Sequence, residues 1–242
     1  MSELAARAVP LREVVTEFAR IGITAFTTTR SHGDFAIADS PPDADNVERW
    51  KALQRDLEPR PCGLASAHQV HGTNIAEHRS PWDGWVRLSG VDAHIVTSPV
   101  GAAAVTVADC VPVFIAHPSG TVAMVHAGWR GTAAGIVAAT ISRLGNSDLA
   151  AGDLHMHLGP AICGRCYGVG PDVYEQLTGW QTIRNRNVDL RALLAEQARE
   201  AGVRSVSASA WCTRCDNDRF FSHRAGDSQR QIAVIVARSD SI

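Results

Sequence analysis

The chain contains 242 residues with a formal net charge of −2, and 45% of them are hydrophobic. The near-neutral charge excludes a general electrostatic attraction to nucleic acid or membrane surfaces, and no apolar run approaches the roughly 20 residues needed to span a bilayer. Residues 1–10 lack the apolar central stretch of a signal peptide. We therefore expect a cytoplasmic protein without nucleic-acid or membrane partners, whose six cysteines are thiols rather than disulfides.

Length and composition favour one domain over residues 1–242. A domain holds roughly 150 residues as a prior, but no linker rich in Pro, Ser or Gly divides this chain. A chain of this size can bury a sizeable core without disulfides. A monomer and a homodimer are both compatible with this pattern.

Several elements are predicted in the first hundred residues. Apolar residues recur at spacings of three and four between residues 43 and 57, which predicts a helix. Runs rich in apolar and β-branched residues predict strands at 23–30, 64–70 and 92–98. Residues 11–20 are compatible with a short helix or an irregular entry, and residues 79–90 favour a loop.

Two apolar runs in the middle of the chain each end at a chemically reactive residue. The run 102–108 stops at Asp109 and Cys110, and the run 121–125 stops at His126. Apolar runs of this length bounded by Gly, Pro and Asp are typical of buried strands. Strand ends that enter turns are where a rigid scaffold presents functional side chains, so we expect these residues to belong to a site.

The second half predicts further helices and strands. Helices are expected at 132–144, at 171–177 after a helix-starting proline, and at 189–201 between Asp189 as N-cap and Gly202 as stop. Strands are expected at 111–117, 154–158, 203–209 and 231–237. Successive strands without room for helices pair antiparallel. The predicted class is α+β, with mixed, largely antiparallel layered sheets flanked by helices.

The segment from His126 to Gly131 would lie just before the helix predicted at 132–144. Free backbone N–H groups and the positive dipole end of a helix attract anions, and Arg130 offers a planar fork of donors suited to phosphate. The alternative is that the glycines make a tight turn and Arg130 is a solvated charge, because Gly-x-x-Gly alone is a weak motif.

Six motifs in a fixed order extend this pattern over nearly the whole chain. They are Gln69–Gly72, Ala108–Pro112, His126–Gly131, Gly159–Val169, Cys212–Thr213 and Arg219–Arg224. Together they resemble the laccase-domain family, also called multicopper polyphenol oxidase-like. Members of that family are associated with purine nucleoside phosphorylase and adenosine deaminase activities, and some bacterial members are called peptidoglycan editing factors.

The resemblance implies a fold of layered sheets with flanking helices and a set of site residues. The implied metal ligands, which are also the implied catalytic residues, are His71, Cys110 and His126. Zinc is the expected ion and Cu²⁺ the alternative. The implied substrate and phosphate contacts are Gln69, Arg130 and Arg224. The chain departs from the family at residues 35–42 and on the helix that follows, which affects substrate contacts from the N-terminal third but leaves the metal residues intact.

Three further residues have two interpretations each. Asp109 is a candidate for proton transfer or ribose contact, or else a strand-end residue that orients Cys110. Trp129 and Phe221 would stack on a purine base, or else they are core aromatics.

Three protein ligands leave one of zinc's four coordination positions open for water or substrate, which is the pattern of a catalytic site. Together with the activities associated with the family, the resemblance implies an enzyme acting on purine nucleosides and phosphate, giving free base and ribose 1-phosphate from adenosine, inosine or guanosine, with adenosine deamination as a second activity. The usual zinc deaminase signature, His-x-Glu with Pro-Cys-x-x-Cys, is absent.

Two other enzyme classes remain as alternatives. A copper-dependent polyphenol oxidase needs several His-x-His pairs, and this chain has one such pair, His155 and His157. A Cys-His hydrolase acting in peptidoglycan editing would use Cys110 as a nucleophile with a neighbouring histidine as base. A zinc ligand and a nucleophile are exclusive roles for one thiolate.

The last alternative is a structural zinc site made by two Cys-x-x-Cys pairs. These pairs are Cys163 with Cys166 and Cys212 with Cys215. The gap between them is more than twice the roughly 15–20 residues usual for such sites, and the family motifs already include two of the cysteines. Sequence reasoning therefore favours separate roles for the two pairs.

Overall fold

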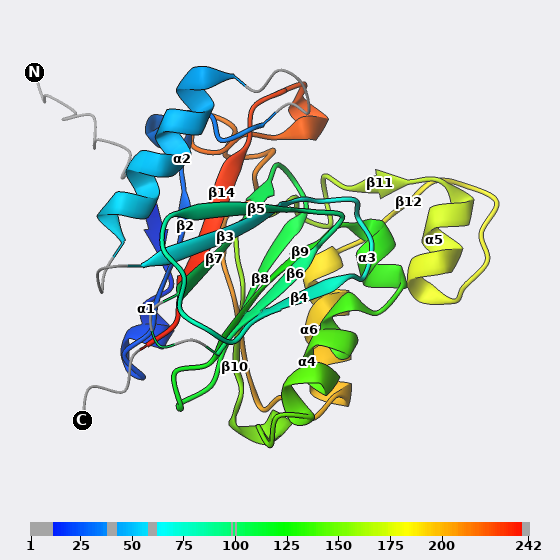
Figure 1. The fold of residues 1–242 in the computed structure, drawn as a ribbon. Helices are drawn as coiled ribbons and strands as arrows, with labels where there is room; N and C mark the ends of the chain where they lie inside the picture. Colours follow the sequence, from blue (N-terminus) through cyan, green and yellow to red (C-terminus); the bar gives the residue numbers. More distant parts are fainter. Residues whose placement is uncertain (1–11, 38–42, 58–61, 98, 100, 239–242) are drawn as a thin grey trace, which may run out of the picture.

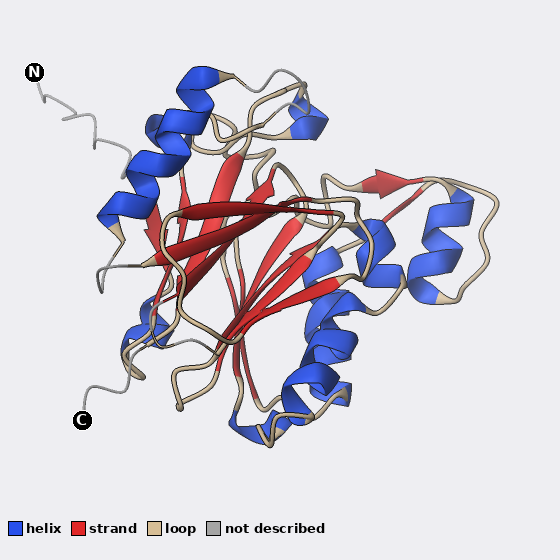
Figure 2. Cartoon of the chain, viewed as in Figure 1, coloured by secondary structure: helices blue, strands red, loops and turns tan. Residues whose placement is uncertain are grey.

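The computed structural model describes residues 12–37, 43–57, 62–97, 99 and 101–238. Two mixed six-stranded sheets pack face to face, and helices cover both outer faces (Figures 1 and 2). The first sheet contains, in spatial order, β1 (Arg12–Val14), β2 (Thr24–Thr28), β14 (Gln231–Val236), β7 (Gly101–Val107), β3 (Gly63–His68) and β5 (Trp85–Ser89). The second contains β13 (Ser205–Ala208), β10 (His155–Leu158), β8 (Val111–Ala116), β9 (Val122–Ala127), β6 (Ala93–Val96) and β4 (Ile75–His78).

The helices lie outside this pair of sheets, and a small ribbon projects from one end. The helices are α1 (Thr16–Ala19), α2 (Ala44–Asp56), α3 (Trp129–Ala133), α4 (Ile136–Gly145), α5 (Pro171–Thr178) and α6 (Leu190–Glu200). The ribbon pairs β11 (Gly168–Val169) with β12 (Arg186–Asn187) next to α5 (Figure 1). Among the described residues, no helix combines the length and apolarity needed to cross a bilayer.

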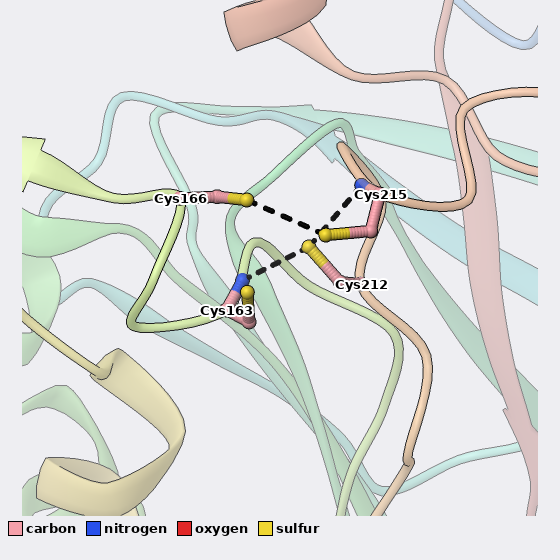
Figure 3. Close-up of side chains that lie close together, drawn as sticks. All are labelled: Cys163, Cys166, Cys212 and Cys215. Atoms are coloured by element: carbon pink, nitrogen blue, oxygen red, sulfur yellow. Dashed lines mark hydrogen bonds between the residues drawn. The ribbon is translucent and has the colours of Figure 1, made fainter.

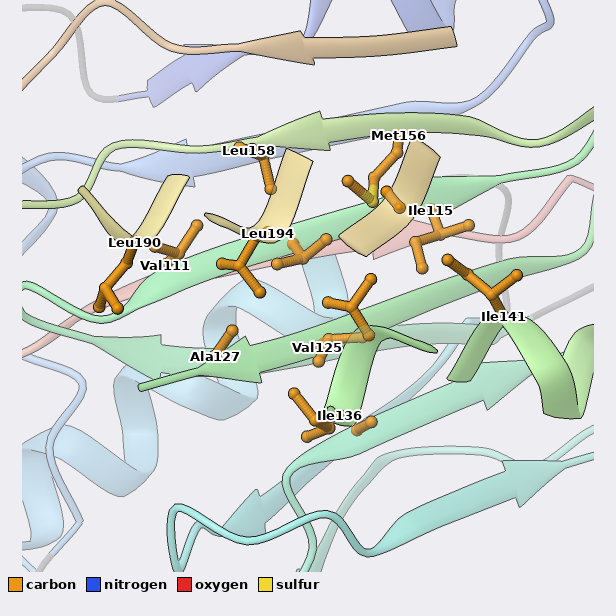
Figure 4. Packing of buried hydrophobic residues seen from close by; sticks show 14 of the residues in the cluster. Val111, Ile115, Val125, Ala127, Ile136, Ile141, Met156, Leu158, Leu190 and Leu194 are labelled. Carbon is orange, nitrogen blue, oxygen red and sulfur yellow. The ribbon is translucent and has the colours of Figure 1, made fainter. Parts of the chain in front are cut away.

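Side-chain alternation along the strands builds the layers. In β8, Phe114 packs between the two sheets, whereas its neighbours Val113 and Ile115 pack against the outer helices. Figure 4 shows this outer layer, in which residues of β8, β9 and β10 meet Ile136 of α4 and Leu194 of α6. Each fully buried aliphatic or aromatic side chain contributes about 1.5–3 kcal/mol. On the opposite face, α2 covers the first sheet with three buried side chains, Trp50, Leu53 and, just beyond its end, Leu57.

The expected α+β class with layered sheets is confirmed, but the pairing of the central strands differs. β8 and β9 pair antiparallel as expected. β7 does not pair with β8; it lies in the first sheet, antiparallel to β14 and parallel to β3. The chain therefore crosses between the sheets at Asp109 and Cys110, where Asp109 has a left-handed φ of 85°. This crossing places the candidate site residues Asp109 and Cys110 where the first sheet meets the second.

Three local predictions need correction. The helix expected at 132–144 is two helices, because Gly135 adopts a φ of 76° between α3 and α4. Residues 79–90 include a strand, β5, that pairs parallel with β3. In residues 11–20, expected to form a short helix or an irregular entry, residues 16–19 do form the short α1, but residues 12–14 form the strand β1. Of the segment 35–42, residues 38–42 lie outside the described residues.

Candidate metal centre and active site

Three strands deliver the three expected metal ligands to one point. His71 follows β3, Cys110 lies at the crossing from β7 to β8, and His126 is near the end of β9. Their ligand atoms all lie within 4.8 Å of one another. The His71 and His126 rings are 4.7 Å apart between centroids and stand at 77° to each other. Convergence of these side chains, expected from the resemblance, is therefore present in the fold.

A buried aspartate that sequence reasoning missed organises the two histidines. Asp92 Oδ1 lies 2.9 Å from Nδ1 of His126 and accepts a hydrogen bond of 2.9 Å from the backbone N–H of His71. Its Oδ2 accepts backbone N–H groups from Val70 and Gly72 at 3.2 and 2.8 Å. The Nδ1 contact leaves Nε2 of His126 as the atom available to a metal, a common arrangement for metal-binding histidines. The only sequence signal was an acidic residue at the start of a predicted strand.

Electrostatics at this point favour the thiolate of Cys110. Burial alone raises the pKa of the Cys110 thiol, but the adjacent His126 and His71 outweigh burial and hold that pKa below its ordinary value. Burial lowers the pKa of His126, whereas Cys110 and Asp92 raise it, and the net direction is upward. The carboxyl pKa of Asp92 is held down by His126 and backbone N–H groups against the opposing effect of its burial. The thiolate is the form of cysteine that binds metals.

The backbone around these ligands is constrained in two ways. His71 and Asp109 have φ values of 59° and 85°, and among the described non-glycine residues only Asp148 shares such a positive φ. Strained φ values in non-glycine residues cluster at functional sites. The lack of a side chain at Gly128 lets the His71 ring and the Cys110 sulfur lie close to its backbone. A Cβ there would lie 2.8 Å from Cδ2 of His71 and 3.1 Å from Sγ of Cys110.

Two cavities meet at the ligand cluster. The larger has a volume of about 500 Å³ and includes Gln69, His71, Cys110 and His126 in its lining. The smaller, of about 300 Å³, contains the residues expected to hold phosphate. His71 and Cys110 line both cavities. Their volumes are in the range of small-molecule sites, so the ligand cluster has open space on two sides.

The smaller cavity brings Arg130 and Arg224 together with Asp109. The Arg130 guanidinium lies over the Trp129 ring at 4.4 Å from its centroid, so this ring supports an arginine in the structure. The Arg224 guanidinium lies 5.1 Å from the Tyr167 ring centroid. The helix expected to begin after Gly131 instead begins at Trp129 and has five residues. The charge available to an anion in this cavity would therefore come from the two guanidinium groups rather than from a long helix dipole.

Asp109 is fully engaged by neighbouring chain segments. Its Oδ1 accepts the hydroxyl hydrogen of Thr213 at 2.6 Å, and its Oδ2 accepts the backbone N–H of Arg224 at 2.6 Å. Its carbonyl oxygen accepts the N–H of Ile162. These contacts favour a role in holding the Cys110 turn and the Arg224 loop in place.

Two other expected contacts have structural partners. The Gln69 amide exchanges hydrogen bonds with the Thr106 backbone, donating to its carbonyl at 2.8 Å and accepting from its N–H at 2.7 Å. Gln69 thus ties the end of β3 to β7 while lining the larger cavity. Phe221 is 6% exposed and lies under the Arg30 guanidinium at 4.5 Å, and it lines neither cavity, which agrees with the core interpretation.

The four cysteines of the two Cys-x-x-Cys pairs lie together in a second cluster. The Sγ atoms of Cys163, Cys166, Cys212 and Cys215 lie within 4.8 Å of one another. The inference from chain spacing that the two pairs are separate is wrong, because β10 and β13 run parallel side by side and bring the loops that follow them together. His155 and His157 belong to neither cluster, and His157 Nδ1 contacts the Ser207 hydroxyl at 2.8 Å.

Comparison with known proteins gives the family. Residues 29–238 match the model of the family described as multi-copper polyphenol oxidoreductase laccase. The chain belongs to this family. It is similar to a purine nucleoside phosphorylase of Streptomyces coelicolor, with 36% identity over 83% of this chain and 85% of the relative. A purine nucleoside phosphorylase of Pseudomonas aeruginosa is 31% identical over 90% of this chain and 94% of its own length.

Solved structures agree with the laccase-family fold. YlmD from Geobacillus stearothermophilus is 27% identical, covers 90% of this chain and 92% of its own, and superposes with a TM-score of 0.78. The hypothetical protein YfiH of Bacillus licheniformis, 23% identical, superposes with a TM-score of 0.81 over 96% of this chain and 98% of its own, which shows the shared fold. The family and the relatives together support an enzyme.

The donor set at the first cluster fits a metal ion. Two imidazoles and one thiolate are ligands that zinc and copper both accept. The Asp92 contact to His126 supplies the outer support that metal-binding histidines normally have. The neighbouring cavities leave room for a fourth, exchangeable ligand. Among the described residues, neither metal-type cluster has the many histidines of a multinuclear copper centre.

Proposed function

We propose that this chain is a zinc-dependent purine nucleoside phosphorylase that acts on adenosine, inosine or guanosine. The observation that supports this most strongly is the meeting of two cavities at His71, Cys110 and His126, with Arg130 and Arg224 in the smaller one. A phosphate bound by those arginines would lie beside a nucleoside in the larger cavity. Relatives at 31% and 36% identity are named purine nucleoside phosphorylases.

In this proposal the chain's residues bind and orient two substrates. Arg130 and Arg224 neutralise phosphate through their guanidinium donors, and Asp109 holds the Arg224 backbone at that position. A phosphate oxygen forms the bond to C1′ of the ribose as the glycosidic bond breaks. The base leaves with the electron pair and gains the proton that hydrogen phosphate loses. Bound zinc would supply a Lewis acid at the junction of the two cavities.

The same geometry favours a Cys-His hydrolase as the second candidate. Cys110, His126 and Asp92 are arranged as nucleophile, base and orienting carboxylate. The two proposals differ in metal dependence, because a thiolate bound to zinc is not free to attack. Metal-free protein that is active, and that loses its activity when Cys110 is alkylated, would favour the hydrolase. Protein that is inactive until zinc is restored would favour the phosphorylase.

The test is a chromatographic assay on protein purified without chelator or affinity-tag metal and with its zinc quantified. We expect inosine to yield hypoxanthine and ribose 1-phosphate only when phosphate is present. Adenosine assayed in the same way reports deamination as inosine or hypoxanthine and phosphorolysis as adenine. Nucleoside turnover that is equally fast in metal-free protein or without phosphate would overturn the proposal.

A further inference from the structure

The four-cysteine cluster lies on two loops at the ends of neighbouring strands. Cys163 and Cys166 are on the loop after β10, and Cys212 and Cys215 are on the loop after β13. Figure 3 shows the four side chains directed toward one another, two from each loop. We propose that this cluster, Cys163, Cys166, Cys212 and Cys215, binds a single structural Zn²⁺ ion through four thiolates.

The sulfur positions suit one ion rather than a larger cluster. Four thiolates at about 2.3 Å from a central zinc stand about 3.8 Å apart at the corners of a tetrahedron. Here all pairs lie within 4.8 Å, and Sγ of Cys166 and Cys215 are 3.4 Å apart. A cluster of two or four irons, which is also held by four cysteines, would force the sulfurs farther apart than this.

Backbone donors already point at one of the sulfurs. The N–H groups of Cys163 and Cys215 donate to Sγ of Cys212 at 3.3 and 3.4 Å (Figure 3). Each pair also encloses one arginine, Arg165 or Arg214, and Arg214 Nη1 donates to the Cys166 carbonyl at 3.3 Å. The Arg214 cation would offset part of the net negative charge of a zinc tetrathiolate.

The cluster has the closed form of a structural site. Four protein ligands complete the coordination of zinc and leave no position for substrate. None of the four cysteines lines either active-site cavity. The ion would instead fasten two loops that have little regular pairing with each other. Within the described part of the chain, they share one isolated β-bridge, between Ala161 and Cys212, and a few hydrogen bonds such as that from Arg214 to the Cys166 carbonyl.

The two loops that the ion would fasten both contact Asp109, the residue before Cys110. The first loop donates the Ile162 N–H to the carbonyl of Asp109, and the second donates the Thr213 hydroxyl to its carboxylate. Asp109 precedes the ligand Cys110 in the sequence. Zinc in the four-cysteine cluster would therefore stabilise the turn that presents Cys110, without contacting substrate.

The test removes one site and counts metal at the other. In the full-length Cys110→Ala protein, grown with zinc and purified without chelator, we expect one zinc per chain by mass spectrometry. The double variant Cys110→Ala/Cys163→Ala is expected to retain none. Cys62→Ala in the Cys110→Ala background is the matched control, because Cys62 is buried in the layer under α2, away from both clusters.

Cobalt gives a readout that needs no substitution in the four-cysteine cluster, so it does not depend on the folding of variants at those four residues. Co²⁺ added to metal-stripped Cys110→Ala protein is expected to show the intense visible and charge-transfer bands of four thiolate ligands. Restoring Zn²⁺ to stripped protein is expected to raise Tm by on the order of 10 °C. Absence of zinc from Cys110→Ala protein, a cobalt spectrum without thiolate bands, or an intact mass showing disulfides among the four cysteines would each overturn the inference.

Discussion

The two sulfur-containing clusters share ligand chemistry but differ in their surroundings. His71, Cys110 and His126 come from three separate strand ends, supply three ligands and face two cavities. The four-cysteine cluster comes from two loops, supplies four ligands and lines neither of those cavities. The number of protein ligands and the space beside them distinguish a site that can bind substrate from one that can only bind an ion.

The difference also appears in how each cluster is held. Backbone strain at His71 and a buried carboxylate at Asp92 fix the first cluster within the rigid sheets. The second cluster relies on its own loops and, in our proposal, on its metal. We therefore expect the first to control turnover and the second to control stability.

The largest expected effect is that of Cys110→Ala. Loss of one of three ligands should abolish metal binding at that site and lower kcat/KM by about 10³-fold or more, because the Lewis acid is lost. Circular dichroism should show an unchanged fold, and the four-cysteine cluster should keep its zinc. Retained turnover in Cys110→Ala protein would refute the assignment of this ligand. The reverse experiment is Cys163→Ala, which should lower Tm while most turnover at 25 °C remains.

Arg130→Ala should act on phosphate and little on nucleoside. Removal of one of the two guanidinium groups is expected to raise the KM for phosphate by about 10–100-fold. Arg130→Lys keeps the charge but loses the planar fork, so it should recover only part of the effect. Initial rates over a grid of phosphate and inosine concentrations separate the two KM values. An unchanged phosphate KM in Arg130→Ala would remove this residue from the anion site.

Gly128→Ala tests the close packing around the first cluster. The added Cβ would lie 2.8 Å from Cδ2 of His71, so this ligand must shift and metal affinity should fall by about 10-fold or more. Gly145→Ala is the matched control, because a Cβ there meets no atom within 4 Å. Competition with a zinc-binding dye measures both affinities, and equal values in the two variants would show that the glycine is not required.

The smallest effect concerns an ion pair outside both clusters. Asp227 Oδ2 accepts hydrogen bonds from Arg30 at 2.5 Å and Asn217 at 2.7 Å, and the Arg30 contact lowers the Asp227 pKa to about 2. A lowered folded-state pKa gives stability that is present above the unfolded value, about 3.9, and is lost as pH falls toward 2. Asp227→Asn should cost about 1–3 kcal/mol at pH 7.

Denaturant titrations of wild type and Asp227→Asn between pH 7 and pH 2 measure this contribution. The difference in the free energy of unfolding should be constant above about pH 5 and should shrink below about pH 4. A difference that stays the same down to pH 2 would show that the carboxylate charge has no part in it.

Much of the first cluster could be predicted from local signals. Apolar runs that end at Cys110 and His126 indicate strand ends, whereas His71 joined the expected ligand set only through the resemblance to the laccase-domain family. The carboxylate of Asp92 was missed because its partners come from two other chain segments, Val70–Gly72 and His126 on β9, and no local pattern encodes them. The pairing of β7 with β14 rather than β8 is equally non-local, because it depends on the chain crossing between sheets at Asp109.

For the four-cysteine cluster, the residues could be recognised in the sequence but their convergence could not. Its two Cys-x-x-Cys pairs are plain in the sequence, but their separation along the chain argued against a shared site. The parallel pairing of β10 with β13 closes that distance, with Leu158 beside Ala208 just before the two loops begin. Chain spacing excludes a site only when the strands between the motifs are not brought side by side.

The most direct test of the central claim is the phosphate dependence of inosine cleavage in protein with and without metal at His71, Cys110 and His126. We predict equal amounts of hypoxanthine and ribose 1-phosphate from wild-type protein, at a rate proportional to zinc occupancy of this site, and no product when phosphate is omitted. Cleavage of equal rate in Cys110→Ala protein, or hypoxanthine released with free ribose in the absence of phosphate, would contradict the account.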